Sequence, residues 1–124
     1  MRMELPALIG RGVVAVTARY CTNDPYVITL GFPVAVCEQE WLIGRELLAE
    51  GLDTGAAGIG DVRVTARGDV VTLGLSTPDG VGWVVFRRDD VAALVTLTHR
   101  LVMPGHEGEF LDWSDTAGFP GEAP

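Results

Sequence analysis

Four side chains of this sequence are of the types that hold a metal ion through sulfur or nitrogen: Cys21, Cys37, His99 and His106. Zinc sites that use cysteine usually draw two ligands from a close pair such as Cys-x-x-Cys. Cys21 and Cys37 are the only two cysteines, and they are sixteen positions apart. This spacing favours two buried free thiols over a zinc site or a disulfide. We therefore expect neither a metal nor a cofactor.

Carboxylates are the other candidates for catalysis. Asp61, Asp69, Asp89 and Asp90 lie where strands or helices are predicted to begin or end, and capping and solubility explain acidic residues at such positions. No Ser-His-Asp or Cys-His arrangement is suggested by the spacing of the sequence. The sequence therefore predicts a protein that is not an enzyme.

A glycine-rich segment at residues 53–60 superficially resembles a phosphate-binding loop. Such a loop continues into Lys-Ser or Lys-Thr and then into a helix. Here neither dipeptide follows, and the next predicted element is a strand. We interpret the segment as a flexible connector between two halves of the chain.

The charge of the chain argues against binding to nucleic acid. Nine basic residues, all of them arginine, stand against seventeen acidic residues, which gives a net charge of −8. Proteins bind phosphate backbones mainly through lysine and arginine, so an excess of carboxylates opposes such binding.

Length and composition predict one globular domain. The chain has 124 residues, of which 48% are hydrophobic, enough for one real core. Its apolar runs are far shorter than the roughly 20 residues that span a bilayer. The first residues lack the apolar region and cleavage site of a secretory signal. We expect a cytoplasmic protein.

Hydrophobic patterning predicts the elements of the first half. Strands are predicted at 13–20, 26–32 and 41–43. Because Pro33 interrupts the ladder, 34–37 is either a bent continuation of the second strand or a separate short strand at an edge. Large apolar side chains occupy every second position of 26–32, and Tyr26, which begins this run, is expected to pack inward.

A short helix is predicted from Arg45 to Glu50, where good helix formers follow one another. Leu47, Leu48 and Leu52 are expected to face the core. Gly51 stands where a left-handed residue would end the helix.

The second half repeats this order. Strands are predicted at 62–67, 71–75 and 81–87, with Trp83 in the core, and a helix from Asp89 to Val102. The fold class is therefore α+β, with two β-β-β-α halves at about 11–52 and 60–104 and antiparallel sheets. Residues 1–107 are expected to form the single domain, and residues 108–124 an acidic, flexible tail.

Six short segments follow one another along the chain: Asp24-Pro25-Tyr26, Trp41, Arg45 to Leu52, Gly60 to Val64, Ser76 to Gly80, and Val102 to Glu107. In this order and at these distances they resemble the SsgA-like family of sporulation and cell-division regulators of filamentous actinomycetes. The strand after Asp61 continues Thr65-Ala66-Arg67, where many members have Trp-Pro. The chain therefore resembles a divergent member.

The resemblance implies a fold similar to the Whirly and mitochondrial RNA-binding proteins and assembly as a homotrimer. It also implies a role as a protein-binding adaptor in septum placement. The partner would be FtsZ or another SsgA-like or membrane-associated division protein, and the chain would be recruited to the division septum. The alternative is a single-stranded nucleic-acid binder, as Whirly-like folds often are, for which Arg63 and Arg67 supply one small basic strand face.

The candidate surface for a protein partner is the exposed side of the predicted helix at 45–50 and the loop that precedes it. Its residues are Glu38, Glu40, Arg45, Glu46 and Glu50. Glu46 and Glu50 repel mildly because they are four positions apart on a helix, an arrangement that hints at a partner supplying positive charge.

Overall fold

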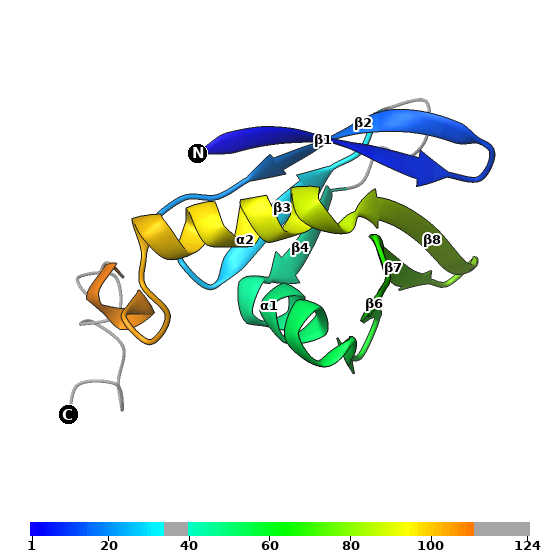
Figure 1. Ribbon diagram of the computed structural model, residues 1–124. Coiled ribbons are helices and arrows are strands. Elements are labelled where there is room, and N and C mark those ends of the chain that lie inside the picture. The colour runs from blue at the N-terminus through cyan, green and yellow to red at the C-terminus, as the bar shows by residue number, and fades with distance from the viewer. Residues whose placement is uncertain (34–39, 111–124) are drawn as a thin grey trace.

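The computed structural model describes residues 1–33 and 40–110 and folds them into one curled sheet with two helices (Figure 1). The eight strands pair in the order β4-β3-β2-β1-β8-β7-β6-β5, and every pair is antiparallel. The strands are β1 (Arg2–Ile9), β2 (Gly12–Arg19), β3 (Val27–Gly31), β4 (Glu40–Gly44), β5 (Ala56–Ile59), β6 (Val62–Arg67), β7 (Val70–Thr77) and β8 (Gly80–Arg87).

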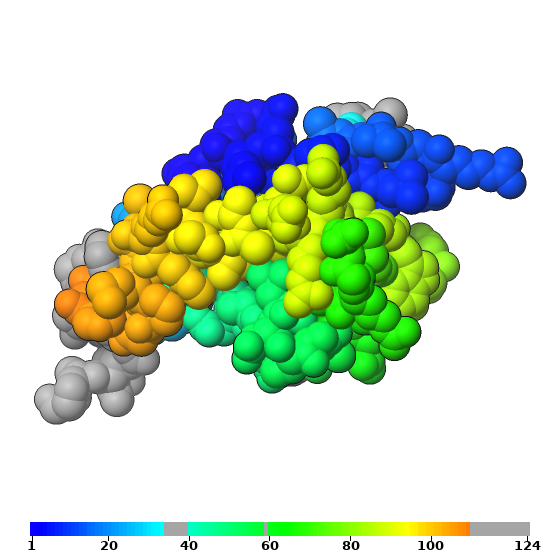
Figure 2. Space-filling model, in the orientation of Figure 1, coloured from blue at the N-terminus to red at the C-terminus, as the bar shows by residue number. Residues whose placement is uncertain are grey.

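The two halves of the sheet meet where β1 pairs with β8. Only Ala7–Ile9 of β1 pairs with Val84–Phe86 of β8, whereas β1 and β2 pair along their whole length. The β1–β2 hairpin consequently projects beyond the body of the molecule (Figure 2). Because β1 and β8 share hydrogen bonds, one sheet runs through both halves of the chain.

Helices α1 (Arg45–Thr54) and α2 (Arg88–Leu101) cover one face of the sheet and contact each other. Figure 2 shows α2 lying between β1 and α1. A short 3-10 helix, η1 (Glu107–Phe110), follows α2. None of the helices among residues 1–33 and 40–110 is long and apolar enough to cross a membrane.

The hydrophobic core lies between the sheet and the two helices. Alternate residues of the strands face it, as Ile28 and Leu30 do from β3 and Val71, Leu73 and Leu75 do from β7. From the helices it receives Leu48, Val91, Leu94 and Val95. The predicted α+β class and antiparallel pairing are confirmed, with a single sheet in place of separate sheets.

Two strands were not predicted. β1 contains Pro6, which cannot donate to a ladder, and the structure accepts it because β8 pairs only beyond this residue. β5 occupies the segment interpreted as a flexible connector, which was wrong: it forms a hairpin with β6 around Gly60, whose φ is +66°. The segment predicted as a strand at 34–37, with Cys37, lies outside the described residues.

The end of α1 also differs from expectation. Gly55, with φ +90°, is the left-handed residue that ends the helix, and its N–H donates to Gly51 O at 2.9 Å. Gly51 lies inside the helix, where a Cβ would stand 2.4 Å from Val64 Cγ1. Gly51 therefore permits close packing of α1 on β6 rather than a turn of the chain.

Three residues expected inside the protein are exposed. The Cys21 thiol is exposed, Tyr26 retains 47% of its surface and Trp83 retains 55%. Both faces of β8 carry apolar residues, so pattern alone did not fix its orientation. Val84 and Phe86 face the core, which turns Trp83 to the opposite side of the sheet.

Candidate functional site

The polar centre of the molecule is Arg45, the first residue of α1, whose exposed fraction is 0%. Its backbone N–H donates to Tyr26 O at 2.9 Å, which joins the start of α1 to the turn before β3. Its side chain enters the core side of the helix. The expectation that Arg45 lies on a solvent-exposed binding surface is therefore wrong.

The Arg45 guanidinium binds the C-terminal end of α2. Nη1 donates to Val102 O at 2.7 Å and to Thr98 O at 3.0 Å, both at the C-terminal end of that helix. Thr98 O also accepts from the backbone N–H of Val102 at 2.9 Å, and both carbonyls lie at the negative end of the helix dipole, so a buried cation there is stabilised. Arg45 thus fastens the beginning of one helix to the end of the other.

Glu107 supplies the countercharge. Arg45 Nη2 donates to Glu107 Oε2 at 2.8 Å, and Glu107 Oε1 accepts from Gly105 N at 2.9 Å. Glu107 is 6% exposed and was expected only as the end of the domain. The hydrogen bond from Arg45 is the main reason that the pKa of Glu107 lies below its ordinary value of 4.5.

Tyr20 completes the contacts of the guanidinium. Arg45 Nη1 donates to Tyr20 Oη at 3.0 Å, and the guanidinium carbon lies 5.6 Å from the centre of the Tyr20 ring. The Tyr20 hydroxyl in turn donates to Pro25 O at 2.8 Å. Burial raises the pKa of Tyr20, so its phenol stays protonated and keeps this donor.

Three of the six sequence segments therefore meet at one buried network, which we call the arginine network: Tyr20, Pro25, Arg45, Thr98, Val102 and Glu107. The Asp24-Pro25-Tyr26 segment contributes backbone carbonyls, the 45–52 segment contributes the arginine, and the 102–107 segment contributes the carboxylate. A close apolar approach joins a further segment, because Gly51 of the 45–52 segment packs against Val64 of the 60–64 segment. These segments hold the fold together.

The chemistry available to the arginine network is structural. The guanidinium donates to carbonyls, a phenol and a carboxylate, so its role is to hold these groups together. Among residues 1–33 and 40–110 there is also no group of three or more His, Cys, Asp or Glu that could hold a metal ion.

An apolar cavity of about 300 Å³ lies at the opposite end of the sheet. Its walls include Phe32, Trp41, Leu75 and Val84, and Asp79 is the ionisable residue among those that line it. A lone exposed carboxylate on an apolar wall offers neither an acid–base pair nor a metal site. The cavity has the character of a packing hollow rather than of an active site.

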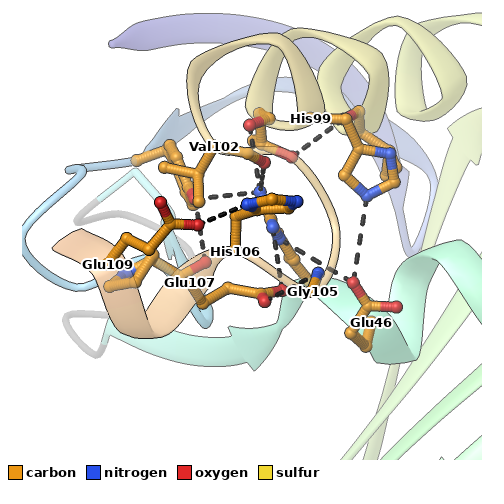
Figure 3. A network of polar contacts seen from close by, with 12 residues as sticks. Glu46, His99, Val102, Gly105, His106, Glu107 and Glu109 are labelled. Atoms are coloured by element: carbon orange, nitrogen blue, oxygen red, sulfur yellow. Dashed lines mark hydrogen bonds and ion pairs between the residues drawn. The ribbon is translucent and has the colours of Figure 1, made fainter. Parts of the chain in front are cut away.

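The other predicted surface residues are only partly brought together. Glu46 and Glu50 are exposed on α1, and Glu46 Oε1 lies 4.0 Å from His99 Nε2 of α2. Figure 3 shows His99 and Glu46 turned toward each other from the two helices. Glu46 Oε1 is also 3.9 Å from Arg45 Nε, so it is the outermost group beside the arginine network.

Glu40 lies elsewhere. It is on β4, where it pairs with Arg19 of β2 on the face of the sheet that the helices leave uncovered. Glu38 lies outside the described residues. The structure thus keeps Glu46 and Glu50 together on α1 and separates Glu40 from them.

Fold and network together define a class of protein: an α+β scaffold whose buried polar residues fasten its helices and strands to one another. The chain belongs to the SsgA family. The family model described as "Streptomyces sporulation and cell division protein, SsgA" matches residues 14–107. The resemblance predicted from the six segments is therefore confirmed.

Named relatives agree with this assignment. The chain is 41% identical over 111 residues to the sporulation-specific cell division protein SsgB of Salinispora tropica, covering 84% of this chain and 76% of that protein. It is 38% identical to SsgB of Frankia casuarinae, covering 80% of this chain and 72% of that protein.

Solved structures match in fold. One, from work on mutations in SsgB and longitudinal cell division during sporulation of Streptomyces coelicolor, gives a TM-score of 0.80 at 32% identity, over 89% of this chain and 94% of that one. An SsgA-like sporulation-specific cell division protein from Thermobifida fusca gives a TM-score of 0.79 at 25% identity, over 94% and 90%.

Proposed function

We propose that this chain is a non-enzymatic regulator of sporulation-specific cell division that acts as a protein-binding adaptor in septum placement, recruiting or localising FtsZ. Membership of the SsgA family supports the division role. The observation that carries the adaptor mechanism is the arginine network. In this network the buried ionisable residues Arg45 and Glu107 stabilise the fold. Binding of a partner would therefore fall to residues on the molecular surface.

The outward side of α1 is the proposed partner surface, now reduced to Glu46 and Glu50. Both side chains are exposed, and Glu50 forms no ion pair within the part of the chain that the structure describes. Two carboxylates one helical turn apart suit a partner that carries positive charge. Glu40 and Glu38 belong to a separate surface in this proposal.

A double variant, Glu46→Gln with Glu50→Gln, tests this surface. Glutamine is preferred to arginine because a cation at position 46 would stand beside Arg45 and His99 and disturb the fold. The matched control removes two exposed carboxylates elsewhere, Glu4→Gln with Asp79→Asn. Surface changes of this kind should alter the free energy of unfolding by less than about 0.5 kcal/mol.

The readouts are co-purification with FtsZ and the position of fluorescently tagged chain in sporulating cells. We expect the α1 variant to lose septal localisation and FtsZ capture while the control retains both. If the folded α1 variant still marks septa and still captures FtsZ, the partner surface is not on α1. If wild-type chain neither captures FtsZ nor marks septa, the adaptor role itself is rejected.

The proposal includes a homotrimer of cytoplasmic subunits that is recruited to the septum. Among the residues that the structure describes, β4 and β5 are the edge strands of the sheet, and a neighbouring subunit could cover these edges. Light scattering at micromolar concentration tests this part, and a monomeric mass would contradict it.

A further inference from the structure

A basic face with one aromatic side chain lies on the side of the sheet that the helices leave uncovered. We call it the arginine–tryptophan face and define it by Arg63, Thr65, Arg67, Thr72, Trp83 and Arg87. All six point away from the core-facing residues of β6, β7 and β8, with the arginines and Trp83 exposed. Within residues 1–33 and 40–110 its three arginines form no ion pair.

Strand register arranges these residues in three rows. Arg63 pairs with Gly74, which pairs with Trp83; Thr65 pairs with Thr72; and Arg67 pairs with Val70, which pairs with Arg87. Neighbouring strands are about 4.8 Å apart, and residues four positions apart on one strand are separated by about 13 Å. The face is therefore about 10 Å wide, with an arginine at three corners and Trp83 at the fourth.

Gly74 fixes the position of the Trp83 ring. A Cβ built on Gly74 would lie 2.6 Å from Cζ3 of the indole, so the ring rests directly on the backbone of β7. Trp83 nevertheless keeps 55% of its surface exposed. An aromatic ring held against a strand and open to solvent is a preorganised apolar contact, of the kind that anchors interfaces.

The distribution of charge is unusual for a chain whose net charge is −8. No carboxylate occupies any position of the three rows, although acidic residues outnumber basic ones in the whole sequence. The nearest acidic residues along these strands lie in the turns at their ends, which we call the rim of the face. They are Asp61 before β6, Asp69 before β7 and Asp79 before β8, and all three are exposed. The positive surface is thus small and enclosed.

We propose that the arginine–tryptophan face binds an acidic peptide segment of a partner protein, in extended form, with an apolar side chain against Trp83. Carboxylates four residues apart on an extended peptide are about 13 Å apart, which matches Arg63 and Arg67. A peptide can place its carboxylates on the three arginines alone. A polynucleotide would continue past the rim and bring further phosphates to Asp61, Asp69 and Asp79.

This inference rests on the proposed adaptor function and adds a second contact surface, opposite in charge to the carboxylates of α1. The test measures fluorescence anisotropy with a fluorescein-labelled peptide of core Asp-Val-Phe-Thr-Asp at physiological salt. Two further probes are the same peptide with both Asp replaced by Asn, and a labelled 20-nucleotide oligo-dT.

Variant Arg63→Glu with Arg67→Glu should weaken binding of the acidic peptide at least tenfold. The matched control, Arg11→Glu with Arg100→Glu, makes the same change in net charge at exposed arginines outside the face and should leave binding nearly unchanged. Gly74→Ala, which must displace the Trp83 ring, should weaken binding without any change in charge.

Equal loss in the two charge variants would reduce the interaction to general electrostatics and overturn the proposal. Tighter binding of oligo-dT than of the acidic peptide, abolished by Arg63→Glu with Arg67→Glu, would replace it by single-stranded nucleic-acid binding. If no probe binds while the wild-type chain still captures FtsZ, this face is rejected and the adaptor function stands.

Discussion

The guanidinium of Arg45 and the carboxylate of Glu107, sixty-two residues apart in the sequence, form a buried ion pair with an N–O distance of 2.8 Å. The pair joins the first residue of α1 to η1, the short helix that follows α2. Because the same guanidinium also holds the end of α2, one side chain fixes the mutual position of both helices.

Replacing Arg45 by Met should destabilise the fold strongly. The substitution fills most of the space, but it removes the positive charge beside the Glu107 carboxylate and the donor to Val102 O. Removing one partner of a buried ion pair costs about 3–5 kcal/mol in the free energy of unfolding. Urea unfolding followed by circular dichroism measures this change, with Arg100→Met, at an exposed position of α2, as the control.

The contribution of Glu107 should depend on pH. Its pKa is lower in the folded chain than its ordinary value of 4.5, chiefly because of the hydrogen bond from Arg45. The stability it contributes is therefore present above pH 4.5 and is lost as the pH falls through the folded value. Wild-type chain should lose stability below pH 4.5 more steeply than Glu107→Gln, as thermal unfolding across the acid range would show. Parallel curves would contradict the assignment.

Gly51→Ala should also destabilise the protein, although alanine is the better helix former. The added methyl would stand 2.4 Å from Val64 Cγ1, so α1 must move away from β6. Overpacking of this kind costs about 1–3 kcal/mol. Combining Gly51→Ala with Val64→Ala should recover part of the loss, and a double-mutant cycle by urea unfolding measures the recovery. Strict additivity of the two substitutions would show that the close contact is not the cause.

The sheet was the most predictable part of the fold, because alternation decides which side of a strand is buried. Ile28 and Leu30, and likewise Leu73 and Leu75, face the core as their spacing predicts. β5 escaped prediction because Ala56, Ala57 and Gly58 have no side chains large enough to show a period. Its existence depends on pairing with β6, which local sequence does not encode.

The site was harder to predict for a related reason. An arginine at the start of an amphipathic helix is normally solvated, and nothing near Arg45 in sequence indicates burial. Its burial depends on Thr98 of α2 and on Glu107, which come 53 and 62 residues later in the sequence. The resemblance at Val102 to Glu107 was the only signal that could have pointed to this carboxylate, and it was used to mark the limit of the domain.

Tyr20→Phe isolates the hydroxyl within the arginine network. The ring stays beside the guanidinium, while Pro25 O loses its donor and Arg45 Nη1 loses one acceptor. Leaving such buried groups unsatisfied costs about 1–3 kcal/mol. Tyr26→Phe, at an exposed tyrosine in the adjoining turn, is the matched control and should change stability little.

The same variant carries a second readout at alkaline pH. Burial raises the pKa of Tyr20 above its ordinary value of 10.0, so folding favours the neutral phenol. The stability this provides is complete below pH 10.0 and is lost as the pH rises through the folded value. As the pH rises above 10.0, the melting temperature of the wild-type chain should therefore fall more steeply than that of Tyr20→Phe. If Tyr20→Phe and Tyr26→Phe have the same stability at neutral pH and the same dependence on alkaline pH, the Tyr20 hydroxyl does not stabilise the network. Arg45 is then held by the carbonyls and Glu107 alone.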